Sequence, residues 1–430
     1  MEKIESPKGA RAALVGVVTR EHTEREVEVS LAELARLLET AGGEAVFTLV
    51  QNKEAPDVRT YLGSGKVAEL AFYCARNEID LAVFDCELSP SQIRNIEEVL
   101  GDGVRVIDRS MLILDIFALH AESGEGKLQV ELAQLKYTAP RLMGRGTELS
   151  RLGGGIGTRG PGESQLETDR RHLQRRIRML EESLAEMAAN RRTQRLARDR
   201  SGLARVAIVG YTNAGKSTLL NYLTDAGILA EDQLFATLDP TTRKCQLPGG
   251  ETILLTDTVG FIRNLPHHLV HAFRSTLEEA VHTDLLLILI DASDPEAESQ
   301  LAVTEELLQS LGAGNKPTLY VFNKCDLGAA TPGVAGVREN VLYISAATGQ
   351  GVDLLLRRIE DMLHSGHRRV TFRIPNAKQG LLSGLYKNAT VEDVQYGPEA
   401  VEVTAIVDDR TYGPLREYDV NPVEVKTDEW

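Results

Sequence analysis

Residues 210–217 read GYTNAGKS and match the pattern G-x-x-x-x-G-K-[ST]. An apolar run, ARVAIVG at 204–210, leads into this segment, and the helical pattern STLLNYL at 217–223 leads out of it. A loop of this kind requires a strand before it and a helix after it. The segment therefore predicts a parallel α/β sheet with a phosphate-binding loop at the carboxyl end of one strand.

The residue types in this loop fit a nucleotide phosphate chain. Glycines allow backbone N–H groups to turn toward the α- and β-phosphates, and the following helix presents its positive end to them. We expect the Lys216 ammonium to reach the β- and γ-phosphates and the Ser217 hydroxyl to ligate Mg²⁺. The predicted phosphate-binding residues are Gly210, Tyr211, Thr212, Asn213, Ala214, Gly215, Lys216 and Ser217.

Two further motifs concern the base of the nucleotide. NKCD at 323–326 ends the predicted strand 317–323, and SAA at 345–347 ends the next strand. The Asp326 carboxylate can accept from both the ring N–H and the exocyclic amine of guanine, a donor pair that adenine lacks. All three motifs lie at carboxyl ends of strands, where open α/β sheets bind ligands. They predict a guanine site that includes Asn323, Lys324, Cys325, Asp326, Ser345, Ala346 and Ala347.

A fourth motif, DTVG, follows the predicted strand 251–257. We expect the carboxylate of its aspartate to hold Mg²⁺ through a water and the N–H of its glycine to contact the γ-phosphate. The motif adds Asp257, Thr258, Val259 and Gly260 to the predicted site.

The sequence leaves two positions of this site open. A threonine between the phosphate loop and DTVG should reach the metal, and spacing alone does not choose among Thr237, Thr241 and Thr242. Phe261 stands where many GTPases carry a glutamine that orients the attacking water. Phenylalanine cannot hydrogen-bond water. We expect its side chain to pack beneath the segment that begins with DTVG, or hydrolysis to stay slow until a partner completes the site; the two interpretations are compatible. No catalytic residue is therefore assigned.

The remaining pattern predicts a multidomain α/β protein with four units. They are an α/β unit at 1–122, a helical hairpin at 123–201, the nucleotide-binding unit at 202–366 and a small α+β unit at 367–430. In the first unit we expect strands at 12–19, 44–50, 80–85 and 104–108 and helices at 31–42, 65–77 and 89–101. GSGK at 63–66 lacks phosphate-loop spacing, so a turn that enters a helix is favoured over a second nucleotide site.

The hairpin is predicted from two apolar seams at coiled-coil spacing. The first seam is Leu128, Leu132, Leu135 and Leu142, and the second is Leu173, Ile177, Leu180, Leu184 and Met187. Between them lies a tip at 144–163 with eight glycines and with Arg145, Arg151 and Arg159. Residues 136–200 carry 15 Lys/Arg against 8 Asp/Glu. Glycine-rich, arginine-bearing loops suit contact with a phosphate surface, so these arginines are candidates for RNA binding.

Composition limits the other functions. The 430 residues carry a formal charge of −15, which argues against a nucleic-acid-coated protein, and we expect no DNA partner. Four scattered cysteines predict neither disulfides nor a zinc site. The longest apolar run, 285–290, is too short for a membrane span, and the first residues lack the apolar core of a signal peptide. We expect the protein to be cytoplasmic, with peripheral membrane association as the alternative. We expect it to be a monomer, since no sequence feature requires an oligomer.

In this order GYTNAGKS, FATLD, DTVG, NKCD and SAA resemble the motifs of the Obg–HflX group of translation-factor-like GTPases. GGGIGTRGPGESQLETDRR at 153–171 is similar to the characteristic segment of the HflX family, and the likeness covers nearly the whole chain. The resemblance implies GTP hydrolysis with Mg²⁺ held by Ser217 and Thr237. It also implies that FATLD contacts GTP, which adds Phe235, Ala236, Thr237, Leu238 and Asp239 to the site.

The resemblance further implies association with the large (50S) ribosomal subunit and the splitting of stalled or idle ribosomes under stress. The alternative is a GTPase that regulates a protein partner or a membrane process, with the hairpin as a protein-binding coiled coil. The negative net charge favours the alternative, whereas the local excess of +7 in the hairpin favours RNA.

Overall fold

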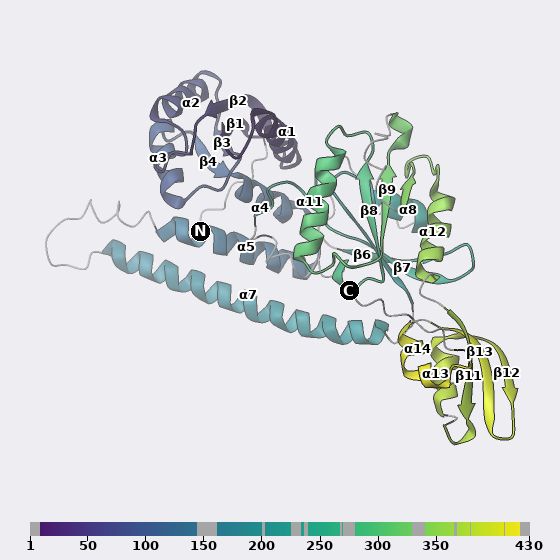
Figure 1. The fold of residues 1–430 in the computed structure, drawn as a ribbon. Helices are drawn as coiled ribbons and strands as arrows, with labels where there is room; N and C mark the ends of the chain where they lie inside the picture. The colour runs from purple at the N-terminus through teal and green to yellow at the C-terminus, as the bar shows by residue number, and fades with distance from the viewer. Residues whose placement is uncertain are drawn as a thin grey trace.

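The computed structural model describes residues 9–143, 161–199, 203–224, 234–235, 240–266, 269, 280–328, 340–364, 368–378, 380–407 and 409–421. It shows two α/β units above a long helical hairpin, with a small α+β unit beyond one end of the hairpin (Figure 1). The predicted multidomain α/β fold class is confirmed. No helix within those ranges is long and apolar enough to cross a bilayer.

The N-terminal unit is a parallel sheet in the order β2-β1-β3-β4. Its strands are β1 (Arg11–Val18), β2 (Glu44–Asn52), β3 (Leu81–Phe84) and β4 (Arg105–Asp108). Its helices are α1 (Glu24–Thr40), α2 (Ser64–Arg76), α3 (Pro90–Leu100) and α4 (Arg109–His120). The four predicted strands and three predicted helices are present. The GSGK segment is a turn entering α2, and Lys66 pairs with Glu69 at 2.9 Å.

Two features of this unit differ from the sequence prediction. Helix α1 begins at Glu24 rather than residue 31, because Thr23 and Glu26 form a reciprocal capping box at its start. Helix α4 was not predicted. Its first nine residues are buried on all sides, so it has no polar face and no 3.6-residue apolar period to read. It packs in one core with α1 and with the hairpin helix α5 (Gly124–Met143).

The hairpin pairs α5 with α7 (Pro161–Asp199), which runs back antiparallel to it (Figure 1). Leu180 is buried, and the other predicted seam residues of α7 are half-buried between exposed neighbours. Lys136–Glu181 and Arg191–Glu125 ion pairs cross the two helices. The second seam is therefore confirmed. The tip arginines Arg145, Arg151 and Arg159 lie outside the described residues, and α7 already includes the last three residues of the predicted tip.

The second α/β unit has a six-stranded sheet in the order β10-β9-β8-β5-β7-β6. The predicted strands are β5 (Arg205–Gly210), β7 (Thr252–Asp257), β8 (Leu285–Asp291), β9 (Thr318–Asn323) and β10 (Val341–Tyr343). The antiparallel edge strand β6 (Thr241–Gln246) was not predicted. From the sequence, helices are expected to start near Lys216, Leu269, Pro295 and Val352. Three of them are present as α8 (Lys216–Thr224), α11 (Ala297–Ser310) and α12 (Val352–His364), and the helix expected from Leu269 lies almost wholly outside the described residues.

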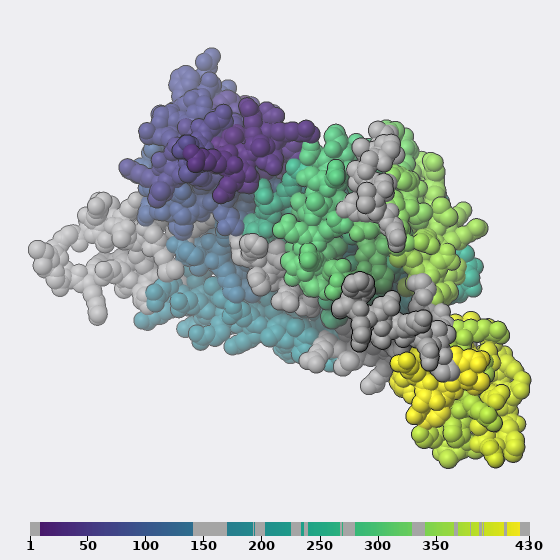
Figure 2. Space-filling model, viewed as in Figure 1, coloured from purple at the N-terminus to yellow at the C-terminus, as the bar shows by residue number. Residues whose placement is uncertain are grey.

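The C-terminal unit is an antiparallel sheet in the order β11-β13-β12, packed on helices. Its elements are β11 (Arg368–Pro375), α13 (Gly380–Asn388), β12 (Thr390–Tyr396), β13 (Ala400–Val407) and α14 (Asp409–Leu415). In the space-filling view this unit projects from the molecule, whereas the two α/β units are in broad contact (Figure 2). A shared apolar core, which includes Phe117 and Phe261, joins those two units.

Candidate guanine nucleotide site

The phosphate loop leaves β5 at Gly210 and enters α8 at Lys216. Two of its glycines are sterically required. A Cβ at Gly210, where φ is +148°, would lie 2.2 Å from the Leu289 carbonyl oxygen. A Cβ at Gly215, where φ is +91°, would lie 2.3 Å from Asn323 Nδ2. Only glycine adopts these conformations in this space, so the backbone of the loop can approach its neighbours closely.

Asn323 connects the three predicted nucleotide motifs. Its Nδ2 donates to the Ala214 carbonyl over 2.8 Å, and its Oδ1 accepts from the Ala346 N–H over 2.8 Å. One buried side chain thus fixes the phosphate loop, NKCD and SAA relative to one another. Asp326 lies in the short 3-10 turn Cys325–Leu327 with an exposed side chain, as base recognition requires.

Lys324 precedes that turn in a left-handed conformation, with φ of +63°. Its ammonium pairs with Asp291, at the end of β8, over 2.7 Å. The sequence motifs did not single out Asp291. The one sequence feature that could have pointed to Asp291 is its position at the carboxyl end of an apolar strand, where ligands bind in such sheets. The pair fixes the stem of Lys324 beside the base-reading turn.

Ser217, Asp257 and Lys216 lie together on the side of the site where the sequence predicts Mg²⁺. Ser217 Oγ donates to Asp257 Oδ2 over 2.7 Å. Asp257 is fully buried, and within the part of the chain that the structure describes its Oδ1 has no hydrogen-bond partner. Burial raises the pKa of Asp257, and the Lys216 charge opposes this shift. A buried carboxylate oxygen that lacks a partner, next to a hydroxyl, fits the oxygen ligands that Mg²⁺ prefers.

The three threonines considered as metal ligands differ in where the structure places them. Thr241 and Thr242 belong to strand β6, where Thr242 Oγ1 and Thr256 Oγ1 share a hydrogen bond of 2.9 Å. Both residues are therefore part of a sheet edge. Ala236, Thr237, Leu238 and Asp239 lie outside the described residues. Phe235 is described and is buried against Phe117 of α4, with ring centroids 4.7 Å apart.

DTVG continues β7 toward the phosphate loop. Phe261 is 1% exposed, as the packing interpretation expects, and its backbone is paired with the loop. Its N–H donates to the Gly210 carbonyl over 3.1 Å, and its carbonyl accepts from the Thr212 N–H over 2.8 Å. The Lys216 ammonium donates to the Tyr211 carbonyl over 2.8 Å. Burial lowers the pKa of Lys216 to about 8, and Asp257 opposes this shift.

A largely parallel sheet that carries a phosphate loop, a buried carboxylate beside it and a turn with the NKCD motif is the arrangement of a P-loop GTP-binding protein. Models of known protein families match four successive segments of the chain, and their descriptions agree with this class. Residues 28–118 match the GTP-binding GTPase N-terminal model, 120–198 the middle region, 205–324 the 50S ribosome-binding GTPase model and 333–407 the HflX C-terminal domain.

Curated relatives lead to the same family. The chain is 48% identical to GTPase HflX of Caldanaerobacter subterraneus subsp. tengcongensis, over 92% of this chain and 91% of that protein. It is 42% identical to GTPase HflX of Escherichia coli K12, over 89% and 90% respectively. A GTP-binding protein from Sulfolobus solfataricus, solved with GDP, is 27% identical with a TM-score of 0.44, covering 83% of this chain and 99% of that one. The chain belongs to the HflX family of GTPases, whose members hydrolyse GTP.

Proposed function

We propose that the motif residues bind Mg²⁺–GTP in the roles that their chemistry suggests. The phosphate loop surrounds the phosphates, Asp326 reads guanine, and Ser217 and Thr237 ligate the metal. The support is the arrangement around Asn323, which brings the phosphate loop and both base-reading segments together. The Mg²⁺ supplies charge stabilisation for phosphoryl transfer when it is bound.

Ser217→Ala tests the metal assignment. The variant removes the hydroxyl that donates to Asp257, so the Mg²⁺ concentration that half-saturates GTP hydrolysis should rise by about tenfold or more. GDP binding without Mg²⁺ should change little, which separates metal loss from misfolding. An unaltered Mg²⁺ dependence would reject Ser217 as a ligand.

We further propose that this GTPase binds the large ribosomal subunit and splits stalled or idle ribosomes. Two findings support it. The model matched by residues 205–324 is described as a 50S ribosome-binding GTPase. Arg171, Arg175 and Arg178 of α7 are exposed at spacings of four and three, which places them on one helix face away from the seam. This stretch of α7 thus presents basic side chains that suit an RNA backbone.

Co-sedimentation with separated ribosomal subunits tests this proposal, with the protein bound to a GTP analogue, bound to GDP and free of nucleotide. We expect nucleotide-dependent binding to the large subunit that weakens steeply with salt, because RNA contacts release counterions. Binding that is insensitive to salt and absent from ribosomal subunits would favour the alternative, a protein partner at the hairpin.

Turnover provides a second test. The buried Phe261 offers no group to orient water, so isolated turnover should be slow and should rise when large subunits are added at fixed Mg²⁺ and salt. A fast enzyme that does not respond to subunits would contradict this expectation.

A further inference from the structure

Two buried polar side-chain atoms of the nucleotide site have no hydrogen-bond partner within the part of the chain that the structure describes. They are Asp257 Oδ1 and Thr212 Oγ1. The proposed Mg²⁺ accounts for the first atom. The second is not accounted for, although Thr212 is only 6% exposed and its hydroxyl is shielded from water. Because an unpaired buried hydroxyl is costly, its place in the phosphate loop needs a reason.

The other buried threonines of the GTPase unit use their hydroxyls to hold the fold. Thr304 Oγ1, for example, donates to the Gln300 carbonyl over 2.9 Å. Among the described residues, the buried threonines of this unit with a hydrogen-bonded hydroxyl are Thr256, Thr258, Thr283 and Thr304. The hydroxyl of Thr212 differs from all four, and it is therefore available to a ligand of the phosphate loop.

The side chain of Thr212 lies where the third phosphate of GTP is expected. A Cβ added at Gly260 would lie 2.7 Å from Thr212 Cγ2 and 3.0 Å from Lys216 Nζ. Thr212 is therefore next to the two residues predicted to contact the γ-phosphate. Because a threonine side chain is stiff about its first torsion, the contact of its methyl group with Gly260 also fixes the direction of its hydroxyl.

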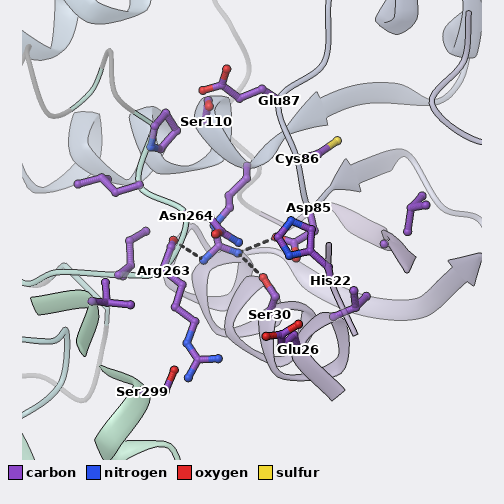
Figure 3. A pocket seen from close by; sticks show the side chains of 18 of the residues that line it. His22, Glu26, Ser30, Asp85, Cys86, Glu87, Ser110, Arg263, Asn264 and Ser299 are labelled. Carbon is purple, nitrogen blue, oxygen red and sulfur yellow. Dashed lines mark hydrogen bonds and ion pairs between the residues drawn. The ribbon is translucent and has the colours of Figure 1, made fainter. Parts of the chain in front are cut away.

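The side chains that follow DTVG do not supply a polar group at this place. Phe261 is 1% exposed and has only an apolar ring. Arg263 and Asn264 line a cavity against the N-terminal unit (Figure 3), which none of the described residues 210–217 lines. Arg263 is also paired with Glu296 over 3.0 Å. The hydroxyl of Thr212 is thus the unused polar group beside the expected γ-phosphate.

The chemistry of GTP hydrolysis gives such a hydroxyl a role. The water oxygen bonds to the γ-phosphorus while the bond from that phosphorus to the β–γ bridging oxygen breaks, and the water protons leave with the inorganic phosphate. A donor fixed beside the oxygens of the transferred group stabilises their charge. A threonine hydroxyl can donate in this way and keep its own proton throughout.

We propose that the Thr212 hydroxyl donates a hydrogen bond to an oxygen of the γ-phosphate and is a catalytic group of this GTPase. The contact gives a partner to a buried hydroxyl that otherwise has none in the described structure. The inference rests on the proposed nucleotide site and does not require ribosome binding. A wild-type protein that does not bind GTP would contradict the proposed function. Normal GTP binding with hydrolysis that ignores Thr212 would contradict this inference alone.

Thr212→Val tests the inference because valine has nearly the shape of threonine but lacks the hydroxyl. Single-turnover GTP hydrolysis at fixed Mg²⁺ should slow by about tenfold or more, as expected for the loss of one donor to a charged transition state. Affinity for a non-hydrolysable GTP analogue should fall by about threefold or more, and GDP affinity should not change. A hydrolysis rate within twofold of wild type would overturn the inference.

Thermal unfolding of the nucleotide-free protein separates a catalytic role from a structural one. Removing a buried hydroxyl that has no partner leaves no group unsatisfied, so the Tm of Thr212→Val should equal or exceed that of wild type. A clear fall in Tm, or failure to fold, would show that the hydroxyl supports the fold and would overturn the inference.

Thr304→Val is the matched control. It removes a buried threonine hydroxyl from the same unit, but one that is already hydrogen-bonded within α11. Its hydrolysis rate and its affinity ratio of analogue to GDP should match wild type. If Thr304→Val slowed hydrolysis as much as Thr212→Val, a general loss of packing would explain both results and the inference would fail.

Thr212→Ser distinguishes the hydroxyl from the methyl group of the same side chain. Serine keeps the hydroxyl and removes the methyl group that faces Gly260. This variant should recover most of the hydrolysis rate that valine loses. A serine variant as slow as the valine variant would assign the effect to the methyl contact and overturn the inference.

Discussion

Asn323 Nδ2 lies 2.8 Å from the carbonyl oxygen of Ala214, so the side chain that begins the base-reading motif holds the backbone of the phosphate loop. The same amide would be 2.3 Å from a Cβ at Gly215. One side chain therefore joins the predicted phosphate-binding loop to the predicted base-reading segments, and a change in either should alter the other.

Gly215→Ala should test this coupling. The added methyl group meets Asn323 at a φ of +91°, so the loop must strain or Asn323 must move. We expect affinity for both GTP and GDP to fall by about tenfold or more, measured by titration. Gly250→Ala is the control, because Gly250 has the same φ of +91° with open space around it. If Gly250→Ala weakened nucleotide binding equally, general backbone strain would explain the effect.

Asp326→Asn should change the base preference. The amide offers a donor where guanine presents donors, and it suits the carbonyl of xanthine instead. We expect GTP affinity to fall on the order of a hundredfold and xanthosine triphosphate to compete better, because a site built for hydrogen bonds rejects mismatched partners strongly. Asp353→Asn, an exposed change in the first turn of α12, serves as control. Unchanged GTP affinity in Asp326→Asn would remove this residue from base recognition.

Asp115 should make the N-terminal unit less stable as pH rises. Burial raises the pKa of its carboxyl to about 7, against the opposing effects of Arg105 and Gln134. The folded state therefore binds a proton that the unfolded state releases near pH 4, so the free energy of unfolding falls between about pH 4 and pH 7, by at most about 4 kcal/mol.

Asp115→Asn removes this pH-dependent cost. Thermal unfolding should show a small change in Tm relative to wild type at pH 4 and a clear gain at pH 8. The exposed Asp102 provides the control, since Asp102→Asn should give no such trend. A constant difference in Tm across this pH range would show that Asp115 is charged in the folded protein.

The tip arginines should contribute to ribosome binding through charge. Replacing Arg145, Arg151 and Arg159 by alanine should weaken large-subunit binding and lower the salt slope by roughly two to three, at one phosphate contact per arginine. GTP affinity should not change. The control removes three exposed basic side chains elsewhere, Arg243, Lys244 and Arg357. Equal effects from both triple variants would mean that net charge, not the tip, controls binding.

The sequence pattern predicted the parallel strands of both α/β units because each is a short apolar run between turn signals. It missed α4, whose burial on all sides hides its period, and β6, whose sequence TTRKCQ lies at a sheet edge with little apolar pattern. The nucleotide motifs could be read because their spacing along the chain is fixed. The contacts of Glu33 with the Tyr211 hydroxyl and of Arg109 with the Arg263 carbonyl could not be predicted, because they form only where two units meet and belong to no local pattern.

Helix α7 has 39 residues, which corresponds to roughly 58 Å at 1.5 Å per residue. A helix of this length, braced against α5 along its seam, acts as a lever that enlarges small movements at its base. A tilt of about 10° would displace the far end by about 10 Å, roughly the diameter of a helix. Modest changes in how the GTPase unit is seated could thus become large displacements at the surface of a bound particle.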